Sequence, residues 1–121
     1  MKKVILGSVL AIAAAGACAQ VADQTFCSGA SGSQTGATVT VGTATDNNFV
    51  KAAFAPKCSS NIALAGRDGG VYYNVGAGST KGKTSFMGSS GGGGIVSSAA
   101  CATTGCNLGN ATTAMAAAPS S

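Results

Sequence analysis

Four cysteines constrain the fold of this chain more than any other residue type. Cys27, Cys58, Cys101 and Cys106 all follow an apolar N-terminal segment. An even number of cysteines in a small exported chain predicts disulfides, and four cysteines allow three pairings. The spacing favours Cys27–Cys58 with Cys101–Cys106, because the second pair is close in sequence and joined through flexible residues. On the chain-entropy model such links stabilise by about 3–4 and about 2 kcal/mol.

Metal binding and redox chemistry are the alternatives for these cysteines. The sequence contains no His, so a zinc site would need all four thiolates. The spacing Cys101-x-x-x-x-Cys106 also differs from the C-x-x-C of redox motifs. Structural disulfides are therefore the prediction, with no metal and no cofactor.

The N-terminus has the pattern of a bacterial secretory signal peptide. Lys2 and Lys3 precede an apolar run over 4–15, and Ala17 and Ala19 supply the small side chains of a cleavage site. A transmembrane helix needs about 20 apolar residues, and polar residues resume at Gln20. We therefore expect residues 1–19 to be a signal helix that is cleaved, an exported mature protein and no transmembrane span.

Cys18 leaves one alternative open. A lipoprotein peptidase would cut before Cys18 and leave it acylated, which would anchor the protein to a membrane. Its recognition box usually has Leu three residues before the cysteine, where this chain has Ala15. The match is partial, so cleavage after Ala19 is preferred.

The mature chain is predicted to be all-β, a small disulfide-stabilised antiparallel meander or sandwich of about five to seven short strands. Runs of β-branched and aromatic residues alternate with Gly-rich and Ser-rich segments, and Asp68-Gly69 is a hairpin signal. The expected strands are 38–41, 49–54, 62–65, 71–75, 84–87 and 95–96.

The domain is expected to span 20–110, with a thin core and two mobile segments. The segment 88–94 has the composition of a flexible linker. The tail 111–121 is Ala/Thr-rich, and an isolated helix there would be marginal. The expected core consists of Val39, Val41, Phe49, Phe54, Ile62, Leu64, Tyr72, Val75 and Phe86.

Residues 77–84 match the permissive pattern of a phosphate-binding loop. Such a loop needs a helix that starts near Lys83, and the Gly/Ser-rich sequence that follows is a poor helix former. The preferred interpretation is a hairpin loop whose Lys81 and Lys83 keep a strand edge soluble. Nucleotide binding is not expected. Together with Tyr72 and Tyr73, these lysines form the candidate binding surface.

Charge argues against nucleic acid as a partner. Without residues 1–19 the chain keeps five cations and three aspartates, so its net charge is 5 − 3 = +2. Nucleic-acid binding calls for a dense basic patch.

The absence of His and Glu excludes several catalytic arrangements, and no enzyme activity is expected. The expectation is a small exported bacterial structural protein of the periplasm or cell surface, for example a subunit of an extracellular assembly or adhesive layer. Its partners would be copies of itself or another surface protein. The alternative is a periplasmic binding or inhibitor module that acts through the Lys/Gly loop.

Overall fold

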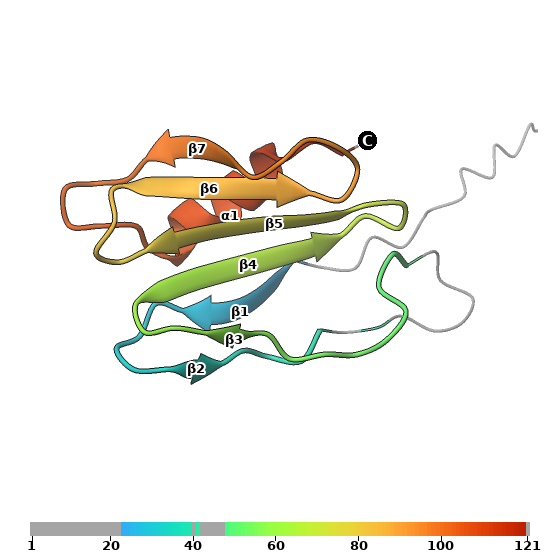
Figure 1. Ribbon diagram of the computed structural model, residues 1–121, viewed down its shortest axis with the longest axis horizontal. Coiled ribbons are helices and arrows are strands. Elements are labelled where there is room, and N and C mark those ends of the chain that lie inside the picture. The colour runs from blue at the N-terminus through green and yellow to red at the C-terminus, as the bar shows by residue number, and fades with distance from the viewer. Residues whose placement is uncertain (1–22, 40, 42–47, 121) are drawn as a thin grey trace, which may run out of the picture.

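The computed structural model describes residues 23–39, 41 and 48–120, and in these residues the chain is mostly β (Figure 1). A five-stranded sheet has the order β1-β4-β5-β6-β7, and β2 pairs with β3 in a second, two-stranded sheet. Every pairing is antiparallel, which confirms the predicted fold class. The elements are β1 (Gln24–Ser28), β2 (Gln34–Thr35), β3 (Lys57–Cys58), β4 (Ile62–Asp68), β5 (Tyr73–Ser79), β6 (Thr84–Ser89), β7 (Val96–Ala100) and α1 (Leu108–Ala117). The predicted signal helix lies outside the described residues.

Three hairpins connect β4 to β7 in sequence order. The predicted turn after Asp68 closes through a hydrogen bond from the Gly69 N–H to the Tyr72 carbonyl, at 2.9 Å. The next hairpin occupies the segment with the phosphate-loop pattern, where Gly82 donates to the Ser79 carbonyl at 2.9 Å. Since Thr84 begins β6, a strand stands where a phosphate loop needs a helix, and the hairpin interpretation is confirmed.

Two of the predicted strands and the predicted linker differ from the structure. The described residues of 38–41 and 49–54 are not in strands. Among the described residues, the Val39 N–H donates a hydrogen bond to the Phe54 carbonyl at 2.7 Å and joins the two segments. The proposed linker 88–94 is instead the end of β6 and the turn to β7. Strands β1, β2 and β3 were not predicted.

The tail that was expected to be flexible from residue 111 instead contributes most of α1. Asn107 caps the helix: its side chain accepts a hydrogen bond from the Asn110 N–H at 3.0 Å, and the Asn110 side chain accepts one from the Asn107 N–H at 2.9 Å. Ala111, Ala114 and Met115 are buried. The prediction was wrong because it considered an isolated helix, whereas packing against the sheet supplies most of the stability of a short helix.

The helix packs against one face of the sheet mainly through alanine and glycine, together with Met115. Ala63 and Ala65 of β4 form a buried cluster with Ala111 and Met115. A Cβ atom at Gly76 would lie 2.0 Å from the Ala111 carbonyl oxygen, so the backbones of β5 and α1 are in direct contact there. This close approach is the reason that alanine and glycine occupy this half of the core.

A second cluster lies on the other face, over β1 and β4. It consists of Phe26, Cys27, Val39 and Cys58, with partly buried side chains packed around it, among them Ile62, Leu64 and Tyr73. Val39 is therefore in the core as predicted. The prediction was wrong for three aromatic residues, because Phe49, Phe54 and Phe86 are 43%, 50% and 46% exposed. The remaining members of the predicted core, Val41, Tyr72 and Val75, are half-buried.

Both predicted disulfides are present. Cys27–Cys58 joins β1 to β3 inside the second cluster, with a Cα–Cα distance of 6.4 Å. Cys101–Cys106 joins the chain just after β7 to the chain just before α1, with a Cα–Cα distance of 5.0 Å. Two structural disulfides in a chain of this size are typical of proteins that fold in an oxidising compartment.

Candidate functional site

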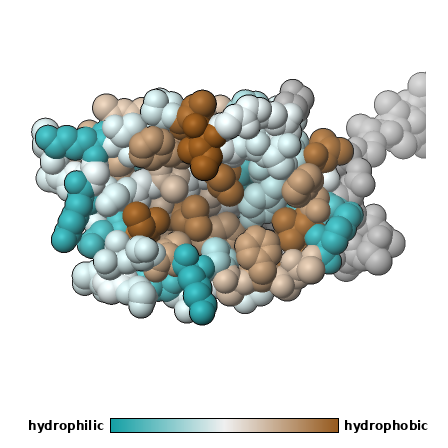
Figure 2. All heavy atoms as spheres, viewed as in Figure 1, coloured by the Kyte–Doolittle hydropathy of each residue, from teal (hydrophilic) through white to brown (hydrophobic). Residues whose placement is uncertain are grey.

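The candidate site is the sheet face opposite α1, where it runs over β5 and β6. Figure 2 shows this face, with apolar residues gathered across its centre. The second cluster covers the β1 and β4 side of the face. Along β5 the residues alternate between the two faces of the sheet. Asn74, Gly76 and Gly78 are buried on the face that α1 covers, whereas Val75 and Ala77 are half-buried on the opposite face. We call the surface formed by Val75, Ala77, Phe86 and Ile95 the open face.

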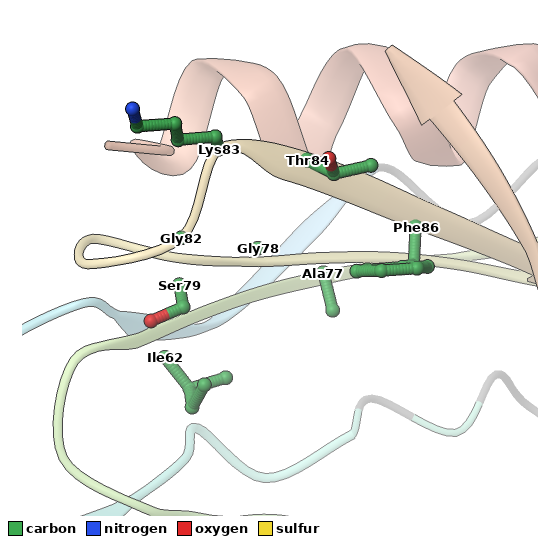
Figure 3. Close-up of a pocket in the computed structure, with 8 residues that line it drawn as sticks. All are labelled: Ile62, Ala77, Gly78, Ser79, Gly82, Lys83, Thr84 and Phe86. Atoms are coloured by element: carbon green, nitrogen blue, oxygen red, sulfur yellow. The ribbon is translucent and has the colours of Figure 1, made fainter. Parts of the chain in front are cut away.

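Two shallow hollows flank the open face. The first has a volume of about 370 Å³ and lies between β4, β5 and β6 (Figure 3). It is at the end near the β5–β6 turn, residues 80–83, which we call the lysine turn. It is lined by Ile62, Ala77, Gly78, Ser79, Gly82, Lys83, Thr84 and Phe86. Its apolar part comes from one side chain of each strand, and its polar side chains are those of Ser79, Lys83 and Thr84. A hollow of this composition suits an apolar side chain better than a charged ligand.

The second hollow has a volume of about 290 Å³ and lies at the other end of β5. It is lined by Tyr73, Val75, Gly88, Ser89, Ser90, Gly93, Gly94 and Ile95. Ile95 is 79% exposed, although a Cβ at Gly88 would contact both Ile95 and Val75 at 3.5 Å. The isoleucine therefore stands on the rim of the open face and is not covered by the described part of the chain.

The two candidate tyrosines have different environments. The ring of Tyr72 lies over Gly69 in the β4–β5 turn. Tyr73 packs against the second cluster, and burial, followed by the nearby negative charge of Asp68, raises the pKa of its hydroxyl to about 12. The buried Tyr73 hydroxyl has no hydrogen-bond partner among the described residues. Tyr73 is thus mainly a packing residue that also lines the second hollow.

The candidate lysines lie at the opposite end of β5 from the tyrosines. β5 runs from Tyr73 to Ser79, a length of about 20 Å, and the lysine turn follows it. Lys81 and Lys83 are exposed, and in Figure 3 the Lys83 side chain extends away from Ile62 and Phe86. The structure therefore does not bring the four candidate residues together in one site.

The two described carboxylates both have structural partners. Asp23 forms an ion pair with Arg67, with 2.7 Å between Oδ2 and Nη2, and this hydrogen bond holds the Asp23 pKa below its usual value. Asp68 is 3% exposed and accepts hydrogen bonds from the backbone N–H groups of Phe49, Val50 and Gly70, at 2.8–2.9 Å. The third carboxylate, Asp46, lies outside the described residues.

The four candidate cysteines are all oxidised in disulfides. The described residues contain no group of three or more His, Cys, Asp or Glu side chains that could hold a metal ion. Within the same part of the chain, no helix is long and apolar enough to span a membrane.

Sequence reasoning missed the open face because its members come from separate strands. Only the register shows that Phe86 lies beside Ala77, which it faces across the β5–β6 pair. No protein-family model, curated protein or solved structure matches this chain.

Proposed function

We propose that the protein is a small exported structural protein of a bacterial periplasm or cell surface, and that it works as a subunit of an extracellular assembly or adhesive layer. The open face carries this proposal. Phe86 and Ile95 are 46% and 79% exposed beside two hollows, and contiguous exposed apolar surface is typical of interaction sites. The partner would be another copy of the chain or another surface protein.

Export is supported by the disulfides and by the signal-peptide pattern over residues 1–19. A structural rather than catalytic role is supported by the described carboxylates. Asp68 holds the segment of Phe49 and Val50 against the sheet, and Asp23 pairs with Arg67. These groups stabilise the fold and do not converge on either hollow.

Intact-mass analysis and light scattering of the native exported protein test the proposal. The mass is expected to correspond to cleavage after Ala19, with two disulfides. Light scattering is expected to show association that increases with protein concentration. A protein that stays monomeric at every concentration and is absent from surface fractions would contradict the proposal.

A pair of lysine variants tests the open face itself. Ile95→Lys places a charge on its rim and should weaken association. Val71→Lys is the matched control, because Val71 is also apolar and is 73% exposed, in the β4–β5 turn. Equal association of the two variants would show that the open face is not the contact surface.

The second candidate function is a periplasmic binding or inhibitor module that acts through the Lys/Gly loop. The first hollow favours this function, because the lysine turn borders it. The test is a partner from periplasm that binds in a 1:1 ratio to the wild-type protein. Lys83→Glu should abolish that complex, whereas Lys57→Glu, a change at another exposed lysine, should not. Equal retention by both variants would exclude the turn as the binding element.

A further inference from the structure

The two edges of the five-stranded sheet differ. β1 forms one edge, and the segment after it closes that edge. The Ser28 N–H donates to Gln34 Oε1 at 3.0 Å, and the Ala37 N–H donates to the Phe26 carbonyl at 3.3 Å. The chain thus uses the Ser28 N–H and the Phe26 carbonyl of β1 internally.

β7 forms the other edge, and none of the described strands pairs with its outer side. Four of its five residues are exposed, and Ser98 is half-buried. In Figure 1, β7 lies at the margin of the sheet, and α1 lies behind the sheet rather than beside this strand. An unpaired edge presents a row of N–H and C=O groups that can accept another strand.

Soluble proteins usually protect such an edge with charged side chains, above all lysine. Here no charged residue follows Lys83, so β6, β7 and α1 are all uncharged. The β7 sequence Val-Ser-Ser-Ala-Ala has small side chains in its centre and no proline. Two such strands can approach each other without like-charge repulsion.

We propose that β7 pairs with β7 of a second copy, antiparallel and about a two-fold axis, so that two five-stranded sheets become one continuous sheet. This inference rests on the proposed function, in which copies of the chain associate. The two-fold arrangement follows from the closed β1 edge: if the five-stranded sheet has one open edge in the described part of the chain, strand addition uses the same surface on both copies. The product is a closed dimer rather than an open fibre.

The geometry of β7 limits the strength of this dimer. Between the pairs Thr84–Ala100 and Phe86–Ser97, β7 has one residue more than β6, which is a β-bulge. The bulge shortens the regular ladder that a second copy can extend. A contact made by one short strand buries less than the roughly 800 Å² per partner of a standard interface. The dimer is therefore expected to be weak and to depend on the protein concentration.

Charge variants at Ala99 test the pairing with the full mature protein. Ala99 is exposed near the centre of the expected interface. Ala99→Lys and Ala99→Asp should each be monomeric, because the two-fold axis brings like charges together. Mixed in equal amounts, the two variants should form a heterodimer, and this rescue separates edge pairing from misfolding. Thr103→Lys, which adds the same charge after β7, is the control and should dimerise like the wild-type protein.

Light scattering and hydrogen exchange give the readouts. The inference predicts that β7 joins copies in pairs only, and that the β7 amides become protected as the concentration rises. If copies associate but Ala99→Lys associates as well as Thr103→Lys, the edge pairing is wrong and the proposed function stands. A mass that grows beyond two subunits by way of β7 also overturns the inference. If no association occurs at any concentration, both proposals fail.

Discussion

Gly76 of β5 and Ala111 of α1 touch through their backbones. A side chain at position 76 would begin 2.0 Å from the Ala111 carbonyl oxygen and 2.4 Å from the Met115 nitrogen. The helix therefore depends on the absence of a side chain in the strand. This contact explains how a chain with few large apolar residues in its centre still forms two packed layers.

Gly76→Ala should destabilise the protein by about 1–3 kcal/mol or more, because the methyl group forces α1 away from the sheet. The free energy of unfolding in urea measures the effect. Gly94→Ala is the control: a Cβ at Gly94 meets no atom within 4 Å, so the change should stay within about 0.5 kcal/mol. Equal stabilities of the two variants would show that the close contact does not hold the helix.

Removing the two disulfides separately should give unequal losses. The Cys27→Ala/Cys58→Ala variant opens a link with a sequence separation of 31 and should lose about 4 kcal/mol on the chain-entropy model. The Cys101→Ala/Cys106→Ala variant opens one with a separation of 5 and should lose about 2 kcal/mol. Urea unfolding of both variants tests the order, and a reversed order would contradict the loop-length argument.

Asp68, which is buried, should contribute more to the free energy of unfolding than Asp23, whose ion pair is exposed. Asp68→Asn weakens three hydrogen bonds to backbone N–H groups and should cost about 2–4 kcal/mol. Asp23→Asn breaks an exposed ion pair and should cost less than about 1 kcal/mol. Thermal or urea unfolding distinguishes them, and similar costs would show that Asp68 does not hold its segment in place.

The Asp23–Arg67 pair also predicts a pH dependence. The ion pair lowers the Asp23 pKa, so its contribution to stability is present above the unfolded pKa of about 4 and is lost as the pH falls through the folded pKa. Unfolding measured from neutral to acidic pH should show this loss in the wild-type protein. Asp23→Asn should lack this component, and an unchanged acid profile would contradict the assignment.

Tyr73 predicts a loss of stability at alkaline pH. Burial raises the pKa of Tyr73 to about 12, so its contribution is full below the unfolded pKa of about 10 and is lost as the pH rises to about 12. Absorbance of the phenolate measures the titration. Tyr73→Phe should remove this component and cost little stability at neutral pH, because the buried hydroxyl has no described partner to lose. A large neutral-pH loss would reveal a bond to the hydroxyl.

The predictable parts of the fold were those set by local chemistry. The hairpin after β4 follows from Asp68-Gly69, whose turn geometry depends on neighbouring residues alone. The cysteine pairing followed from spacing and from the flexible segment between Cys101 and Cys106. These features need no knowledge of which sheet face is covered.

The rest depended on contacts between distant segments. Ala63 and Ala65 alternate with Ile62 and Leu64 in β4, and the alternation predicts two faces without indicating which one a helix covers. The helix that covers Ala63 and Ala65 is stabilised by the approach to Gly76, 35 residues before Ala111 in the sequence. Phe86 was therefore assigned to the core, although it lies on the face opposite α1.

The candidate tyrosines and lysines could not be placed relative to one another from the sequence. Tyr73 and Lys81 were assigned to one candidate binding surface. An extended strand separates them by its full length: Tyr73 lines the second hollow, whereas the turn of Lys81 borders the first through Lys83. Only the strand register could show this.

A helix that rests on glycine and alanine has consequences for how this sequence can vary. Any substitution of a glycine adds atoms, and nearly every substitution of an alanine does the same. The glycine and alanine positions between β4, β5 and α1 can therefore be altered almost only by enlargement, which pushes the layers apart. A library that randomises these positions should return mostly the smallest residues, whereas the surface turns should accept many.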